Sequence, residues 1–249
     1  EISLGLVGSE MCIRDSIYHE ALERYSKKLD RESTDWFSVT DAKRDELAME
    51  AINEVIDEYA GFGIFDTAES QHSISHMKAV FKQTVWALTT QIRRGSFVPE
   101  RFEFSFYESL DMANDVTVDI KGRVDRTDTY TDEGRLFVKV LDYKSGNTVF
   151  DLVKLYYGTQ LQLAVYMDAV MEQKKEALKQ VSVEPGGMLY YHIDDPVIDL
   201  KDVTPGTELS EEEINQMILK KLKPDGLINS DEKAYRGMDR DFEKSSDVI

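Results

Sequence analysis

Three charged residues, Asp125, Asp142 and Lys144, interrupt a stretch whose hydrophobic pattern predicts buried β-strands. Residues 136–144 read LFVKVLDYK, so the even-numbered positions, which share one face of a strand, carry three apolar residues followed by Asp142 and Lys144. The other face is also mostly apolar, as in an inner strand covered on both sides. Because burying an unpaired charge is costly, such groups are normally paired or bound to a metal ion. We therefore interpret these residues as a site for chemistry.

Two carboxylates, with a lysine two residues after the second, are suited to metal-assisted hydrolysis of a phosphodiester. Carboxylate oxygens bind Mg²⁺ or Mn²⁺, and such an ion can bridge to a phosphate. The ion lowers the pKa of a bound water and offsets the charge that develops on the phosphoryl oxygens, while a lysine can orient the water or stabilise the transition state. Because Asp-X-Lys alone is a common triplet, its meaning depends on the elements around it.

Two strands joined by a tight turn are expected to carry the carboxylates. Residues 116–124 alternate apolar with polar side chains, which places Asp125 at the far end of a half-buried strand. Residues 131–134, Thr-Asp-Glu-Gly, supply the turn before the strand that carries Asp142. Further strands are expected over residues 101–109 and 187–194.

Helices are expected on both sides of this hairpin. Asp151 is a suitable N-cap for a helix over 152–173, in which Gln162 and Tyr166 lie four residues apart on one face. Other helices are expected over 16–25, 41–59, 73–94 and 210–222.

His19 lies beside the apolar stripe of the helix expected over 16–25. A lone histidine in such a position is more often structural than a metal ligand.

The order of these motifs resembles the RecB-type nucleases of the PD-(D/E)XK superfamily. The resemblance rests on His19, on GRVDRTD at 122–128, on DYKSG at 142–146 and on LQLAVY at 161–166. It covers roughly residues 16–245, and within that group the sequence is most similar to AddB-type nuclease domains, which belong to the second subunit of bacterial AddAB helicase-nucleases. Four motifs in one order are more specific than any single motif.

This resemblance implies a restriction-endonuclease-like α/β fold, with a mixed sheet flanked by helices and a helical insertion over about 34–95. It further implies a ligand set for Mg²⁺ or Mn²⁺, a catalytic lysine, and two residues that orient the active site or contact DNA. These are, in turn, His19, Asp125, Asp142 and the Tyr143 carbonyl; Lys144; and Gln162 with Tyr166. The implied function is a cytoplasmic, metal-dependent exonuclease for single-stranded DNA in double-strand break repair and recombination, with an AddA-type helicase-nuclease subunit as partner.

The cysteine content departs from the family pattern. AddB-type domains usually hold a four-iron cluster on one cysteine before the histidine helix and three near the C-terminus, whereas this chain has a single cysteine, Cys12. One thiolate cannot hold such a cluster, so we predict no iron–sulfur cluster in this chain and expect a fragment that stops before the cluster residues.

The first residues suggest a foreign origin. Residues 2–16 resemble a translated sequencing adapter, so residues 1–15 are expected to be a non-native leader before a nuclease domain over 16–249. The alternative is a frayed N-terminal strand.

Composition limits the remaining possibilities. A chain of 249 residues with 41% hydrophobic content can bury one α/β core, and the lack of paired cysteines is typical of a reducing compartment. The net charge of −18 opposes tight DNA binding by this domain alone, although basic residues such as Arg123 could line an entry for a strand that a basic partner delivers.

Two other functions remain open at this point: a non-catalytic DNA-channel or scaffold module of the same complex, and an unrelated metal-dependent hydrolase. Loss of at least one site charge would be expected in a non-catalytic module, and an unrelated hydrolase would leave the motif at Gln162 and Tyr166 unexplained. If the site is catalytic, the side chains of His19, Asp125, Asp142 and Lys144 should converge.

Overall fold

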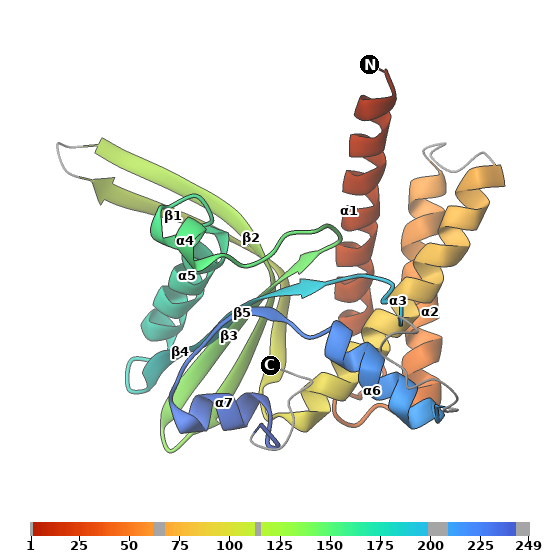
Figure 1. Cartoon of the computed structure of the whole chain (residues 1–249). Helices are drawn as coiled ribbons and strands as arrows, with labels where there is room; N and C mark the ends of the chain where they lie inside the picture. The colour runs from red at the N-terminus through yellow and green to blue at the C-terminus, as the bar shows by residue number, and fades with distance from the viewer. Residues whose placement is uncertain (1, 62–67, 113–115, 199–208, 243–249) are drawn as a thin grey trace.

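A five-stranded mixed sheet forms the centre of the molecule in the computed structural model, which describes residues 2–61, 68–112, 116–198 and 209–242 (Figure 1). Its strands, in spatial as well as chain order, are β1 Val98–Met112, β2 Val116–Asp132, β3 Arg135–Lys144, β4 Ser182–His192 and β5 Asp225–Ile228. Strands β3 and β4 are parallel, and all other neighbours are antiparallel. The predicted restriction-endonuclease-like architecture is therefore confirmed.

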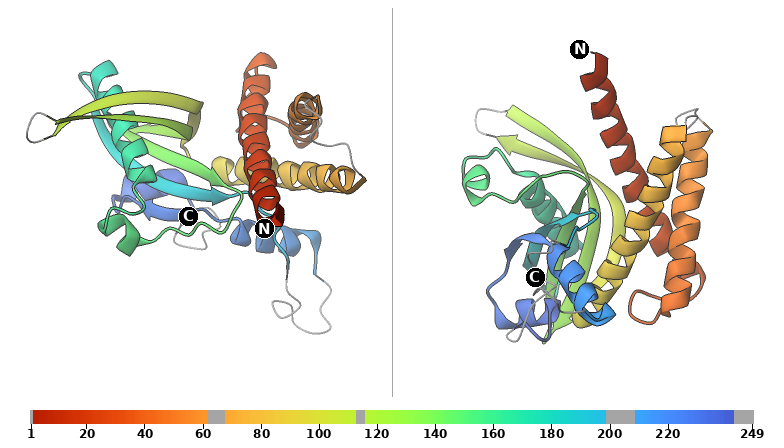
Figure 2. Two further views of the ribbon diagram at one scale, coloured as in Figure 1. Left: turned by 90° about the horizontal axis from the view of Figure 1, so that it is seen from above. Right: turned by 45° about the vertical axis from the view of Figure 1, so that its right-hand side comes forward.

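Helices cover both faces of this sheet, with the first three grouped on one side and the crossover helix on the other (Figures 1 and 2). The N-terminal group consists of α1 Ile2–Arg31, α2 Asp41–Ala60 and α3 Ala68–Arg94. The connection from β3 to β4 contains α4 Leu152–Tyr156 and α5 Gln162–Ala177, and the chain continues into α6 Glu211–Lys221 and α7 Glu232–Met238. Within the described residues, no helix combines the length and apolar content needed to cross a bilayer.

Strand β3 is buried on both faces, as its sequence predicts. Val138 and Val140 pack with Met167 of α5, whereas Leu141 and Tyr143 belong to the core built by α1, α2 and α3. The alternation assigns Asp142 to the α5 face. A tight turn joins this strand to β2, and its central residues Glu133 and Gly134 have φ angles of 45° and 79°. Positive φ at both positions suits the right-handed twist of a hairpin.

Helix α1 is continuous from Ile2 to Arg31, so the alternative of a frayed N-terminal strand is wrong. The amphipathic stripe expected over 16–25 is present, since Ile17, Leu22 and Tyr25 are fully buried. The interpretation of residues 1–15 as a non-native leader stays a prediction.

The single helix predicted over 152–173 is wrong, because the chain breaks between α4 and α5. Asp151 caps α4 as expected, accepting hydrogen bonds from the backbone of Val153 and Lys154. Gly158 then adopts a φ of 72°, a left-handed conformation that ends the helix. The new helix starts at Gln162, which brings this side chain to the first turn of α5.

Candidate active site

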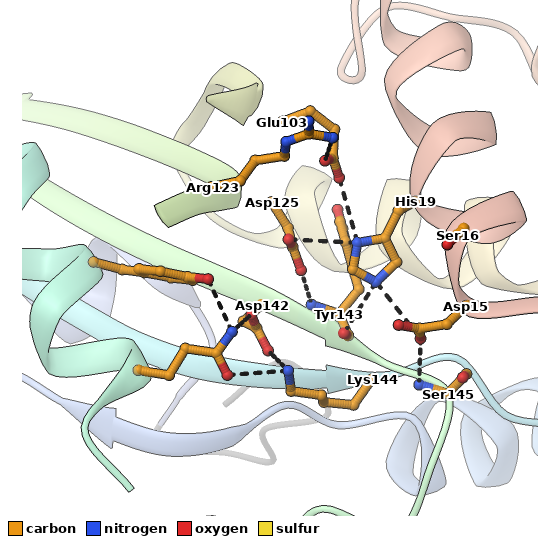
Figure 3. Close-up of polar contacts among 12 residues, drawn as sticks. Asp15, Ser16, His19, Glu103, Arg123, Asp125, Asp142, Tyr143, Lys144 and Ser145 are labelled. Atoms are coloured by element: carbon orange, nitrogen blue, oxygen red, sulfur yellow. Dashed lines mark hydrogen bonds and ion pairs between the residues drawn. The ribbon is translucent and has the colours of Figure 1, made fainter. Parts of the chain in front are cut away.

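Side chains from α1, β1 and β2 meet the backbone of β3 at one edge of the helical core (Figure 3). The Nδ1 atom of His19 lies 3.3 Å from Oε1 of Glu103 and 3.4 Å from Oδ1 of Asp125. Its Nε2 atom lies 3.2 Å from the carbonyl oxygen of Tyr143. One potential ligand atom from each of His19, Glu103 and Asp125 lies within 4.8 Å of the other two. We call these three residues the metal cluster.

A second group of polar residues joins the end of β3 to the first turn of α5. Lys144 forms an ion pair with the buried carboxylate of Asp142 and donates a hydrogen bond of 3.1 Å to Oε1 of Gln162. The amide nitrogen of Gln162 lies 2.8 Å from Oδ1 of Asp142 and 2.9 Å from the hydroxyl of Tyr166. Gln162 therefore holds both the carboxylate and the lysine.

The peptide of Tyr143 connects the two groups. Its N–H donates a hydrogen bond of 2.6 Å to Oδ2 of Asp125, and its carbonyl faces His19. Because Tyr143 stands between Asp142 and Lys144 in the chain, the backbone fixes the metal cluster and the lysine relative to one another. The predicted site residues thus gather in one region, but the carboxylate of Asp142 contacts Lys144 and Gln162 instead of joining the metal cluster.

Two acidic residues near His19 were not anticipated from the sequence. Glu103 falls in a strand whose alternating phenylalanines suggested a core face with solvent-exposed partners. Asp15 falls in the expected leader, yet its Oδ1 lies 3.7 Å from Nε2 of His19 and accepts a hydrogen bond of 3.3 Å from the N–H of Ser145. Only strand register could have revealed Glu103, because the pairs on either side of it place it across from Asp125.

Glu103 stands at a kink in β1. Phe102 packs against the core of α1, α2 and α3, whereas Phe104 packs against the α5 side, although two residues of a regular strand two positions apart share a face. Glu103 between them has a φ of 50°, a conformation that costs a non-glycine residue about 1–3 kcal/mol. Such strain is concentrated at functional sites, and here it occurs where two carboxylates face His19.

The electrostatics of the site favour a bound cation. Burial disfavours the charged form of His19, but hydrogen bonds to Asp125 and Glu103 outweigh it and raise the pKa of the imidazole to about 10. Burial and the charge of Asp125 raise the pKa of Asp142 to about 7, against the opposing effect of Lys144. Several carboxylates in one buried region thus create a strongly negative potential.

The metal cluster suits a hard divalent ion. It offers one imidazole nitrogen and two carboxylate oxygens, with the Tyr143 carbonyl adjacent to His19. Oxygen-rich sets of this kind bind Mg²⁺ and Mn²⁺. The ligand atoms of the three side chains are close enough together to hold a single ion.

Comparison with known proteins agrees with this geometry. Residues 16–245 match the family described as the PD-(D/E)XK nuclease superfamily. The chain belongs to this superfamily. Membership in the PD-(D/E)XK superfamily confirms the assignment made from four short motifs, although which residues of this chain act in the site is still a prediction.

Relatives of this PD-(D/E)XK domain are components of larger assemblies. The chain is 34% identical over 243 residues to an ATP-dependent helicase/deoxyribonuclease subunit, of the AddB type, from Alkaliphilus metalliredigens, a match that covers 94% of this chain and 20% of the relative. It is 36% identical over 228 residues to the corresponding protein of Lachnoclostridium phytofermentans, covering 91% and 18%. The chain therefore spans about a fifth of the length of the curated relatives it matches.

Proposed function

We propose that this chain is a nuclease domain of an AddAB-type helicase-nuclease that hydrolyses single-stranded DNA as an exonuclease, using Mg²⁺ or Mn²⁺. The observation that carries the proposal is the convergence of His19, Glu103 and Asp125 beside the ion pair of Asp142 and Lys144. The names of the relatives, helicase/deoxyribonuclease subunits, support DNA as the substrate.

Each residue of the site has a distinct role in this proposal. The metal cluster and the Tyr143 carbonyl would hold the ion, and Asp142, next to them, stays a proposed ligand. A bound ion would supply a water of lowered pKa and offset charge on the phosphate. Lys144 places its ammonium group where it can orient the attacking water or stabilise charge on the phosphoryl oxygens.

Gln162 is a positioning residue, because it contacts Asp142, Lys144 and Tyr166 at once. We expect Gln162→Ala to lower kcat roughly tenfold to a hundredfold, since a displaced lysine loses its alignment with the reacting atoms. The metal concentration needed for half-maximal activity should change much less. Steady-state cleavage over a metal titration measures both. Gln173→Ala, on the same helix, is the control, and equal kcat values for the two variants would refute this role.

The partner in the proposal is an AddA-type subunit in the cytoplasm. The net charge of −18 makes strong binding of a polyanion by this domain alone unfavourable. A helicase subunit that unwinds the duplex would deliver a single strand to the site. In the alternative function, a non-catalytic scaffold, the domain would bind its partner and DNA without cleaving the strand.

Metal binding can be tested by thermal unfolding. Saturating Mg²⁺ or Mn²⁺ at about 100 times its Kd adds about 2.7 kcal/mol of stability, which corresponds to a rise in Tm of roughly 5–10 °C. Asp125→Asn should lose most of this rise because it removes a charged ligand, whereas Asp119→Asn, on the exposed part of β2, should keep it. An equal rise in both variants would place the ion elsewhere.

A further inference from the structure

Strands β1 and β2 continue beyond the sheet as a two-stranded ribbon, which extends away from the helical core (Figure 1). Strand β3 pairs with β2 only over 126–132, so residues 104–112 and 116–124 pair with one another alone. We call these two segments the ribbon. The metal cluster lies at its base, because Glu103 directly precedes the ribbon and Asp125 directly follows it.

One face of the ribbon continues from the metal cluster. On the α5 face, the Cβ position of Gly122 meets the ring of Phe106, and that ring contacts Tyr166. The residues of opposite parity therefore lie on the other face. They form the cross-strand pairs Ser105 with Arg123, Tyr107 with Lys121 and Ser109 with Asp119. Arg123 contacts Glu103, which shows that this face leads to the metal cluster.

Two cations and an aromatic ring follow one another along this face. The guanidinium of Arg123 lies 3.3 Å from Glu103, and its side chain is 64% exposed. The ammonium group of Lys121 lies 5.3 Å from the ring centre of Tyr107, a ring that is 57% exposed. Lys121 forms no ion pair within the part of the chain that the structure describes. In a protein of net charge −18, such a row of cations beside the site needs an explanation.

The spacing of these groups fits an extended strand. Asp125, Arg123 and Lys121 are two residues apart from one to the next, which is about 6.6 Å per step along a β-strand. Lys121 therefore lies about 13 Å from the level of Asp125. Proteins that hold single-stranded nucleic acids combine cations that follow the phosphates with aromatic rings on which bases stack.

We propose that Tyr107, Lys121 and Arg123, the guiding face, bind the nucleic-acid strand next to the bond that is cleaved. Arg123 contacts the phosphate nearest the metal cluster, Lys121 contacts a phosphate further along the strand, and Tyr107 stacks against a base. This inference rests on the proposed nuclease function and adds the path that the strand takes. It also explains how an acidic domain can retain its substrate.

A competing surface lies on α4, where Tyr156 and Tyr157 are 84% and 74% exposed. The exposed residues around them are mostly aliphatic: Val149, Leu152, Val153 and Leu161. This apolar surface lacks the paired cations that a polyanion requires, so we assign the strand to the ribbon. Variants of both surfaces belong in the test.

Binding of a fluorescent single-stranded oligonucleotide to the 249-residue chain, followed by anisotropy without divalent metal, tests the guiding face directly. We expect Tyr107→Ala and Lys121→Glu each to weaken binding roughly tenfold, through the loss of stacking and of a phosphate contact. Lys121→Ala should also reduce the slope of log K against log salt by about 0.7. The matched control is Lys175→Glu, which makes the same charge change on α5. Weaker binding by Tyr156→Ala, with Lys121→Glu at the wild-type value, overturns the inference.

A small substrate separates this inference from the function on which it rests. Bis(p-nitrophenyl) phosphate contains a phosphodiester but is too short to reach from the metal cluster to Lys121. The loss of kcat/KM caused by Lys121→Glu should therefore be at least tenfold larger for the oligonucleotide than for the small diester. Equal losses on both substrates contradict the guiding face. If the wild type hydrolyses neither substrate, the proposed function fails, and the binding measurement decides the guiding face by itself.

Discussion

Lys144→Ala is expected to lower the rate of strand cleavage by roughly 10²- to 10³-fold, the cost of removing one preorganised group that stabilises charge in the transition state. The lysine forms an ion pair with Asp142 and a hydrogen bond with Gln162, but it is not among the residues that could ligate the ion. Its loss should therefore affect the chemical step more than metal binding. Single-turnover cleavage at saturating metal measures this step.

The control for Lys144→Ala is Lys175→Ala, because Lys175 is an exposed residue on α5 that pairs only with Glu172 among the described residues. Both variants should show the rise in Tm with Mg²⁺ or Mn²⁺ that is expected of the wild type, whereas Asp125→Asn should not. Cleavage by Lys144→Ala at the rate of the control would rule out a catalytic role for this lysine.

Asp128→Ala is expected to destabilise the fold by about 3–5 kcal/mol, because it leaves two buried cations without their shared partner. The carboxylate of Asp128 is fully buried and accepts two hydrogen bonds of 2.8 Å from Arg126. The ammonium of Lys139 lies 2.8 Å from the same carboxylate. Denaturant unfolding measures the change, with Asp119→Ala as an exposed control. A loss of less than about 1 kcal/mol, typical of a surface ion pair, would contradict this account.

The same network predicts how stability depends on pH. Burial raises the pKa of Asp128, but Arg126 and Lys139 outweigh this effect and lower the pKa below the ordinary value of 3.8. A carboxyl group whose pKa is lower in the folded state contributes stability above its unfolded pKa and loses it as pH falls through the folded pKa. The stability difference between the wild type and Asp128→Asn should therefore be constant above about pH 5 and shrink at lower pH.

This network also supports the active site. Arg126 donates a hydrogen bond of 3.1 Å to the hydroxyl of Tyr143, while the peptide of Tyr143 contacts Asp125 and His19. The buried charges thus fix the ring of Tyr143, whose backbone lies within the site. Asp128, which the alternation of β2 assigned to a position away from Asp125, acts on the site through this chain of contacts.

Features that depend on nearest neighbours along the chain could be predicted from the sequence. The alternation of β3 gives its two buried faces, and the four-residue spacing of Gln162 and Tyr166 gives their contact, because both follow from the geometry of a single element. The hairpin turn is likewise encoded by Gly134, which can adopt a positive φ.

Features that depend on how elements meet could not be predicted in this way. Glu103 reaches the metal cluster only through the register of β1 on β2 and through its unusual backbone conformation, and neither leaves a mark in the local pattern. The break between α4 and α5 depends on Gly158, a residue that a helix can also tolerate at moderate cost. The direction of the Asp142 carboxylate depends on two partners that compete for it, Lys144 and Gln162.

The most direct test of the central claim is the release of nucleotides from end-labelled single-stranded DNA by the wild-type chain and by Asp125→Asn. The proposed site predicts release by the wild type with Mg²⁺ or Mn²⁺, none after chelation of the ion, and almost none by Asp125→Asn, whereas the control Asp119→Asn should behave as the wild type does. Release by Asp125→Asn at the wild-type rate, or no release by folded wild-type protein with either ion, would contradict it.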